Sequence, residues 1–337
     1  MADDGFSEGA ATARREVRAA TVETTKDARG ALVASLDAIS ERIAGGDVMG
    51  GMQAVIEFLR EKRAELGVVA WREWATVVID QHKISTQMYQ CPLTRRSKEK
   101  PRGYPGDAVM LDHIYGLGSA ACAPHPTTFA GKLYFHGTNS AACRAVRQRR
   151  DILAREIDRA AENAAPRKAN ILSIACGHLR EIELCNSVSA DRIGRFVAMD
   201  QDQDSLDEIE RSYPGLGLEK VRGSVRDIIR KRFEYGDMDF VYAAGLFDYL
   251  VDPVAMRLVQ HMYGYLRPGG RLLIANFTKD VQDIGYMEAF MDWWLIYRSK
   301  EQIGALADCL PEGEGASISS FADDEGSIAY AIVEKPL

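Results

Sequence analysis

Three residues that could contact a ligand stand within two positions of the ends of stretches that are expected to be parallel strands. They are Gly177, Asp200 and Ser224, which follow the runs 171–175, 196–199 and 218–222. The carboxyl ends of parallel strands meet at one edge of a sheet, and ligands of open α/β sheets bind at that edge. A glycine admits close backbone approach, and a carboxylate suits a pair of ribose hydroxyls. The spacing therefore predicts a site for a nucleoside.

The glycine content of the first loop distinguishes two classes of nucleotide. A dinucleotide favours G-x-G-x-x-G, in which several glycines admit the pyrophosphate to a helix N-terminus. The stretch ACGHLRE, residues 175–181, has only Gly177. S-adenosylmethionine carries no phosphate; it needs one close backbone approach, a carboxylate for the ribose and a slot for adenine. The residues therefore predict S-adenosylmethionine as the cofactor.

Side chains around the same strand ends are candidates for further cofactor contacts. The stretch YAAGLFDYL, residues 242–250, would end another strand and offers small and aromatic surfaces. An aromatic face attracts a cationic sulfonium as it attracts quaternary ammonium groups, and core packing is the alternative for Phe247. The predicted cofactor residues are Ser173, Ala175, Gly177, Asp200, Gln201, Ser224, Val225, Ala244, Phe247 and Tyr249.

The loop PRGYPGD, residues 101–107, combines two prolines with two glycines and is therefore rigid and tightly turned. Asp107 stands where it would cap the helix that follows. The alternative places Tyr104 and Asp107 at the substrate pocket, where Asp107 would serve as a base or orienting group for an amine or hydroxyl. The sequence leaves both roles of Asp107 open.

A run of arginines occupies the first half of the helix expected from Ser140 onward. Such a run usually forms a solvated face, but it could also line an anion site. A carboxylate acceptor needs no base, but it needs a positive or hydrogen-bonding clamp. Asn139 stands at the expected N-cap. The arginines are Arg144, Arg147, Arg149 and Arg150. The predicted catalytic residues are Tyr104, Asp107, Asn139, Arg144 and Arg147.

Apolar periodicity divides the chain into a helical part and an α/β part. Up to Pro166, apolar residues recur at helical spacing, with a break expected at Gly67 and a third helix over residues 68–89. After Asn170, strand-like runs alternate with helical ones, which is typical of a parallel sheet covered on both faces. We expect a flexible tail over residues 1–30, a helical lid and substrate domain over 31–165 and a cofactor domain over 166–337.

The α/β part contains several local patterns with definite structural expectations. LRPGG, residues 266–270, predicts a tight turn before a strand, and ADDEG, residues 322–326, suits a hairpin. Residues 286–308 are expected to be helical. The expected strands are 171–175, 196–199, 218–222, 239–243, 271–276, 317–321 and 328–333.

Composition excludes several functional classes. The 337 residues carry a formal net charge of −7, which argues against a general nucleic-acid binder. The sequence predicts no membrane span, because no apolar run approaches the ~18 residues that one needs. The N-terminus has no apolar stretch typical of a secretory signal. The six cysteines form no CxxC pair, so we expect neither a zinc site nor a disulfide framework, and a cytoplasmic location. We expect a small-molecule partner; a homodimer is left open.

Several stretches resemble known families. SIACGHLREIE, VAMDQD, DFVYAAGLFDYL and YLRPGGRLLIANF resemble, in this order, the motifs of class I S-adenosylmethionine-dependent methyltransferases. From about Lys98 onward, PRGYPGD, NSAACRAVRQRR, AGLFDYL and DWWLIYRS resemble bacterial methyltransferases linked to 3-hydroxy fatty acid methyl esters, the extracellular-factor biosynthesis type. The departure is Ala175, at a position that is commonly glycine.

This resemblance implies an α/β fold with a Rossmann-like, seven-stranded methyltransferase sheet and an N-terminal all-helical lid. It also implies a role in secondary metabolism and methyl transfer to a small carboxylate or amine, with a hydroxy fatty acid as the family-based acceptor. Two rival interpretations stay open. A closed lid could make S-adenosylmethionine cyclise to an azetidine-2-carboxylate type of amino acid and methylthioadenosine, and a non-catalytic cofactor-binding protein is the third interpretation.

Overall fold

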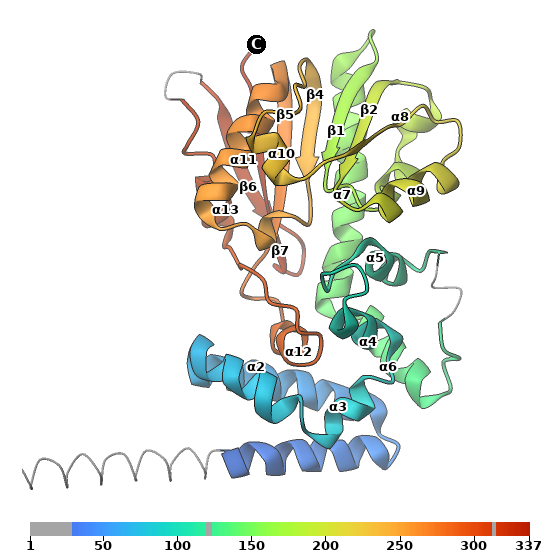
Figure 1. Cartoon of the computed structure of the whole chain (residues 1–337), viewed down its shortest axis with the longest axis vertical. Helices are drawn as coiled ribbons and strands as arrows, with labels where there is room; N and C mark the ends of the chain where they lie inside the picture. The colour runs from blue at the N-terminus through green and yellow to red at the C-terminus, as the bar shows by residue number, and fades with distance from the viewer. Residues whose placement is uncertain (1–28, 119–122, 312–314) are drawn as a thin grey trace, which may run out of the picture.

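The computed structural model describes residues 29–118, 123–311 and 315–337. The chain forms a mixed sheet with helices on both faces and a helical part at the end of the sheet to which the parallel strands point (Figure 1). The predicted tail over residues 1–30 lies, up to residue 28, outside the described residues. No helix within the described ranges is long and apolar enough to cross a membrane.

The sheet has seven strands in the order β3-β2-β1-β4-β5-β7-β6. The first five in this order are parallel, and β7 is antiparallel to both of its neighbours. This confirms the predicted seven-stranded α/β fold and the hairpin at ADDEG. The strands are β1 (Ala169–Ile174), β2 (Ile193–Asp200), β3 (Glu219–Arg222), β4 (Met238–Ala243), β5 (Leu266–Phe277), β6 (Ser317–Ala322) and β7 (Ile328–Glu334).

Alternate residues of the central strands enter two separate apolar cores, as expected of strands buried on both faces. On β1, Ile171 packs into one core and Leu172 into the other. The first core continues into the helical part, and the second lies against α11. The helices and 3-10 turns of this part are α7 (Ala141–Ala164), η3 (Arg180–Leu184), α8 (Asn186–Ser189), α9 (Gln203–Ser212), α10 (Val225–Ile229), η4 (Phe247–Tyr249), α11 (Asp252–Tyr265) and α13 (Lys300–Ala305).

One segment of the α/β part packs against the helical part. Helix α12 (Ile284–Phe290) follows β5 and lies against α2 (Figure 1). Its Glu288, 3% exposed, accepts hydrogen bonds from Arg63 Nε and Trp71 Nε1, both at 2.6 Å. The helical part consists of a helix over residues 29–44, α2 (Val48–Glu73), the π-helix η1 (Trp74–Ile79), α3 (Lys83–Met88), α4 (Pro92–Glu99), α5 (Ala108–Tyr115) and α6 (Phe129–Thr138).

The helical predictions are correct in part. The break at Gly67 is confirmed, because this residue has a φ of 69° and interrupts α2. The predicted helix over 68–89 is wrong as a single element, since it passes into η1 and then ends before α3. The predicted turn at LRPGG is correct in part, because it lies inside β5 but the pairing of β5 with β4 passes from Leu266 to Arg271 and skips residues 267–270. These residues belong to β5, where Gly269 takes a φ of 73° and its N–H donates to the C-terminal carbonyls of Lys335 and Pro336.

The predicted helix over residues 286–308 is broken between α12 and α13. Asp292 takes a φ of 47°, which ends the helical path. The following N–H groups bond to other elements, since Ile296 N donates to Asp248 O at 2.8 Å and Arg298 N donates to Phe277 O at 3.1 Å. This irregular segment therefore fastens the ends of β4 and β5 to each other.

Candidate functional site

Three strand ends meet at Asp200, which is 5% exposed. Its Oδ2 accepts the Gly177 N–H at 2.8 Å, and its Oδ1 accepts the Asp202 N–H at 2.9 Å. The Gly223 N–H donates to the Asp200 carbonyl at 2.9 Å. The structure therefore joins the ends of β1, β2 and β3 by hydrogen bonds centred on one residue, which we call the Asp200 rim.

The surroundings of Asp200 act on its pKa in opposite directions. Burial raises the pKa of Asp200, and the backbone N–H groups that it accepts oppose this rise. A carboxylate offers about four acceptor positions. The N–H groups of Gly177 and Asp202 each occupy one, and the Gln201 N–H also acts on this carboxylate.

The loop after β1 has an unusual backbone. Ala175 and Gly177 take φ values of 54° and 56°, in the left-handed region that L residues rarely adopt. A Cβ at Gly177 would lie 3.3 Å from the Ala108 side chain at the start of α5. Glycine therefore lets the helical part approach this loop. Ala175 is exposed, whereas Ser173, 1% exposed, lies within β1.

The other predicted cofactor residues differ in accessibility. Gln201 is exposed beside Asp200, and Val225 is half-buried at the start of α10. The Ser224 hydroxyl donates to Asp227 at 2.6 Å. Ala244 is half-buried at the end of β4, and Tyr249 is 39% exposed. Phe247 is fully buried in the core that packs on α11. The alternative of core packing therefore applies to this residue.

The loop over residues 101–107 lies against the Asp200 rim. Arg102 Nη1 donates to Asp202 Oδ2 at 2.9 Å and to Ser205 Oγ at 3.0 Å. Burial and the negative charges of Asp200 and Asp202 raise the pKa of Tyr104. Tyr104 therefore lies close enough to Asp200 and Asp202 to feel their charges, and its role at the substrate pocket stays a prediction.

Trp293 closes the space next to this loop. A Cβ at Gly106 would lie 2.3 Å from its indole ring. The indole Nε1 donates to the Tyr249 hydroxyl at 2.8 Å, and the charge of Tyr104 contributes to the raised pKa of Tyr249, behind burial and Asp248. Tyr104, Tyr249 and Trp293 therefore lie together, although they come from distant parts of the chain.

The N-cap prediction for Asp107 is confirmed. Its Oδ1 accepts the Met110 N–H at 2.8 Å, and its two oxygens accept Arg96 Nε and Nη2 at 2.9 and 2.7 Å. Asp107 is 1% exposed. The N-cap prediction for Asn139 is wrong by one residue, because Ser140 accepts the Cys143 N–H and Asn139 ends α6 instead.

The two predicted arginine clamps point away from the rim. Arg144 pairs with Glu325 of the β6–β7 hairpin, with Nη2 and Oε2 at 2.9 Å. Arg147 Nη1 donates to the carbonyls of Ile114 and Thr138, where α5 and α6 end. Arg144 therefore fastens α7 to the β6–β7 hairpin, and Arg147 fastens α7 to the ends of α5 and α6.

Arg149 is not among the predicted catalytic residues, but it lies at the strand ends. It is 5% exposed, and its Nη1 would be 3.6 Å from a Cβ at Gly245, directly after β4. A signal in the sequence could have found it. Arg149 stands three residues after Val146 and four before Leu153, on the apolar face of α7.

A second buried acid lies close to Arg149. Asp248 accepts the Phe277 N–H at 2.6 Å, and burial raises its pKa to about 6 against the positive charges of Arg149 and Arg298. Because the raised pKa lies above the ordinary value of 3.8, the folded state binds more protons than the unfolded chain between these values.

We expect the stability contributed by Asp248 to be fully present below pH 4 and lost as the pH rises to about 6. Asp248→Asn keeps an acceptor for Phe277 N–H but cannot ionise. The free energy of unfolding of the wild type minus that of the variant should therefore decrease from pH 4 to pH 6 and stay constant above pH 6. Urea titrations at these pH values measure this, and a constant difference throughout would contradict it.

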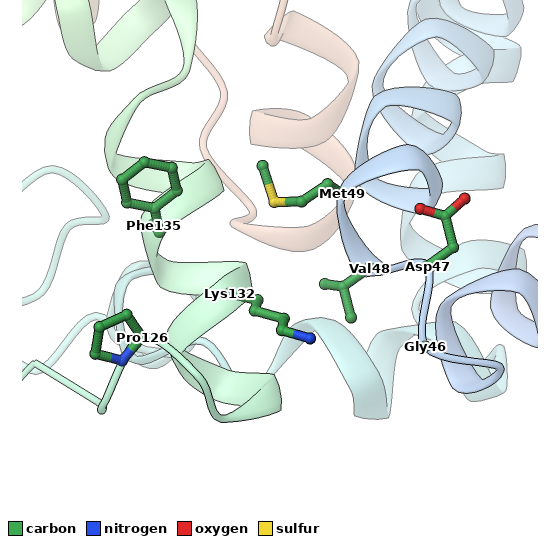
Figure 2. Close-up of a pocket in the computed structure, with 7 residues that line it drawn as sticks. All are labelled: Gly46, Asp47, Val48, Met49, Pro126, Lys132 and Phe135. Carbon is green, nitrogen blue, oxygen red and sulfur yellow. The ribbon is translucent and has the colours of Figure 1, made fainter.

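Two hollows are lined by residues other than those of the Asp200 rim. An apolar cavity of about 30 Å³ separates α7 from the helical part, with Trp293 in its wall and the polar groups of His136 and Asp283 beside apolar side chains. A larger surface hollow of about 400 Å³ lies between α6 and the turn before α2 (Figure 2). In Figure 2, Met49 and Phe135 form the upper part of this hollow and Lys132 the lower part. Among the described residues, no group of three His, Cys, Asp or Glu side chains could hold a metal ion.

Comparison with known proteins identifies the central segment. Residues 171–270, the segment that contains the Asp200 rim, match the family model of the methyltransferase domain. No curated protein matches the chain.

Several solved structures are similar to the chain at low sequence identity. A protein from Bordetella parapertussis described as a possible exported protein has 16% identity, a TM-score of 0.51 and coverage of 77% of this chain and 98% of its own. Magnesium protoporphyrin IX methyltransferase from Synechocystis PCC 6803 has 12% identity, a TM-score of 0.46 and coverage of 71% and 99%. The N-methyltransferase NodS from Bradyrhizobium japonicum WM9 has 16% identity, a TM-score of 0.40 and coverage of 57% and 88%.

Proposed function

We propose that this chain transfers a methyl group from S-adenosylmethionine to an oxygen or nitrogen of a small molecule. The observation that carries the proposal is the Asp200 rim. Its hydrogen bonds join Gly177, Asp200 and Gly223 at three strand ends, and all three residues lie within the segment 171–270 that matches the methyltransferase domain.

The residues of the rim fit the cofactor. Asp200 would accept the ribose hydroxyls at its remaining acceptor positions, and the N–H groups of Gly177 and Asp202 fix the orientation of its carboxylate. The loop after β1 turns through the left-handed conformations of Ala175 and Gly177, which leaves its backbone free to approach the amino-acid end. When bound, the cofactor supplies an electrophilic methyl group on a sulfonium.

We propose that residues 31–165, which are the helical part together with α7, form a lid and substrate domain that covers the rim and positions the reactants. The loop over residues 101–107 is fastened to β2 by the hydrogen bonds of Arg102 with Asp202 and Ser205. Tyr104 and Tyr249 offer aromatic faces to a sulfonium, which such faces attract. Exclusion of water and alignment can together contribute roughly 7–11 kcal/mol to such a transfer in ideal cases.

We propose a carboxylate as the preferred acceptor, with a hydroxy fatty acid as the specific case that the sequence resemblance supports. A carboxylate needs no general base. An amine would need one, and both oxygens of Asp107 are already engaged by Arg96 and the α5 backbone. The apolar cavity beside Trp293 would receive the carbon chain. Its volume of about 30 Å³ holds few atoms, so the lining side chains must move apart to admit an acceptor.

We place the activity in the cytoplasm as part of secondary metabolism, and a homodimer stays a proposal without a structural argument. The five cysteines of the described ranges are free thiols, which is usual for proteins of reducing compartments.

The decisive assay identifies the nucleoside that is released. We expect adenosylhomocysteine when the protein is incubated with S-adenosylmethionine and 3-hydroxy fatty acids, and no product without an acceptor. Short-chain acids and fatty amines of equal chain length are the matched acceptor controls. Methylthioadenosine without an acceptor would contradict methyl transfer, and so would tight cofactor binding with no product across carboxylate, amine and hydroxyl acceptors.

A further inference from the structure

Four arginines of the described chain are buried, and three of them have a carboxylate partner. Arg180 pairs with Asp112 at 2.8 Å, Arg271 with Glu334 at 2.7 Å and Arg298 with Asp252 at 2.6 Å. Arg149 is 5% exposed, and no carboxylate oxygen of the described residues lies within 4 Å of its nitrogens. A buried charge without a counter-ion is costly, so this guanidinium requires an explanation.

The surroundings of Arg149 supply polar groups but no direct counter-ion. The Tyr115 hydroxyl is its hydrogen-bond neighbour. Glu181 is turned to the Tyr242 hydroxyl at 2.6 Å, and Asp248 to the Phe277 N–H. The hydroxyl of Tyr330 has no hydrogen-bond partner in the part of the chain that the structure describes. Burial raises the pKa of Tyr330, and the positive charge of Arg149 opposes this rise. The guanidinium thus retains donors for a further anion.

The position of Arg149 relative to the sheet indicates which end of a ligand it would meet. The strand order changes direction between β1 and β4, and ligands of open α/β sheets bind at this point. Asp200 lies on the β2 side of the point. Arg149 lies on the β4 side, within 3.6–4.0 Å of a Cβ built at Gly245. A nucleoside held by its ribose at Asp200 therefore extends its other end towards Arg149.

We propose that Arg149 binds the α-carboxylate of the cofactor and so fixes the direction of the sulfonium. This inference rests on the proposed function, because it takes the ligand of the Asp200 rim to be S-adenosylmethionine. The guanidinium fork matches a carboxylate in two parallel hydrogen bonds. The buried ion pair is then completed only when the ligand is present. Arg149 is thus the anion site that the arginine run of α7 contains, in place of Arg144 and Arg147.

The test compares S-adenosylmethionine with its decarboxylated analogue, which keeps the sulfonium and the amine. Calorimetry should show that the wild type binds S-adenosylmethionine about 10–100-fold more tightly, in line with a charge-assisted hydrogen-bonding pair. Arg149→Met should weaken S-adenosylmethionine by a similar factor and change the affinity for the analogue by less than about threefold. The preference between the two ligands would then almost vanish.

Arg159→Met is the matched control, because Arg159 is an exposed arginine of the same helix, and it should keep the wild-type preference. Circular dichroism without ligand verifies the fold of each variant. An unchanged preference in Arg149→Met would overturn the inference and leave methyl transfer intact. Equal affinity of the wild type for both ligands would overturn it even if the variant failed to fold. Absence of binding to either ligand would instead refute the proposed function itself.

Discussion

Replacement of Asp112 by alanine is expected to lower the free energy of unfolding by about 3–5 kcal/mol, because it breaks a buried ion pair and leaves Arg180 with only its more exposed partners Glu208 and Glu183. Asp112 is 3% exposed. It accepts Arg180 Nε and Nη2, both at 2.8 Å, and its Oδ2 lies 2.9 Å from His178 Nδ1. Burial alone would raise the pKa of Asp112, but hydrogen bonds from Arg180 and His178 outweigh it and bring the pKa to about 2.

Chemical denaturation at pH 7 measures this loss, and Asp151→Ala at an exposed position of α7 serves as the control, expected to change stability by less than about 0.5 kcal/mol. The stabilisation from Asp112 is present above its ordinary pKa and is lost as the pH falls towards 2. Asp112→Asn should cost less than alanine, since an amide oxygen still accepts from Arg180. A loss below 1 kcal/mol in Asp112→Ala would contradict the assignment.

This network also has a functional consequence, because it connects the helical part to the α/β part. Asp112 belongs to α5, whereas His178 and Arg180 follow β1. Arg180 continues to Glu208 of α9 at 2.9 Å, and His178 Nε2 lies 3.3 Å from Arg102 of the loop over residues 101–107. One set of charges therefore sets the distance between Tyr104 and the Asp200 rim.

The strands and the rim could be predicted from the sequence because their signals are local. An apolar run that ends on Asp200 places a carboxylate at a strand end whatever the rest of the chain does. Asp107 could be predicted as an N-cap for the same reason. The one-residue error at Asn139 is also local, since Ser140 is an equally good cap and only the backbone geometry distinguishes the two.

Other features of the site depend on packing between distant segments. Trp293 contacts Tyr249 and Gly106 in a segment after α12 that is not helical. The N–H groups of this segment bond to residues near the ends of β4 and β5 instead of to helical carbonyls. Periodicity alone predicts a helix there. Arg149 shows the opposite case. Its place on the apolar face of α7 could be recognised from the spacing in the sequence. The charges of the neighbouring arginines, however, made the whole run resemble a solvated surface.

Replacement of Asp200 by alanine is expected to weaken the binding of S-adenosylmethionine by tenfold or more, which corresponds to at least about 1.4 kcal/mol. The variant loses the free acceptor positions that we assign to the ribose hydroxyls. It also loses the acceptor that orients the Gly177 N–H at 2.8 Å and the Asp202 N–H at 2.9 Å. The loop after β1 and the start of α9 would then no longer be held at the rim.

Two further variants separate these contributions. Asp200→Asn keeps oxygen for one backbone N–H but loses the charge, so we expect an affinity between those of wild type and Asp200→Ala. Asp204→Ala, at an exposed position of α9, should bind as the wild type does. Calorimetry with S-adenosylmethionine and with 2′-deoxyadenosine analogues gives the readout: the penalty for a missing ribose hydroxyl should be large in the wild type and small in Asp200→Ala. An equal penalty in both proteins would place the ribose elsewhere, because a carboxylate that contacts the hydroxyl must make its removal costly.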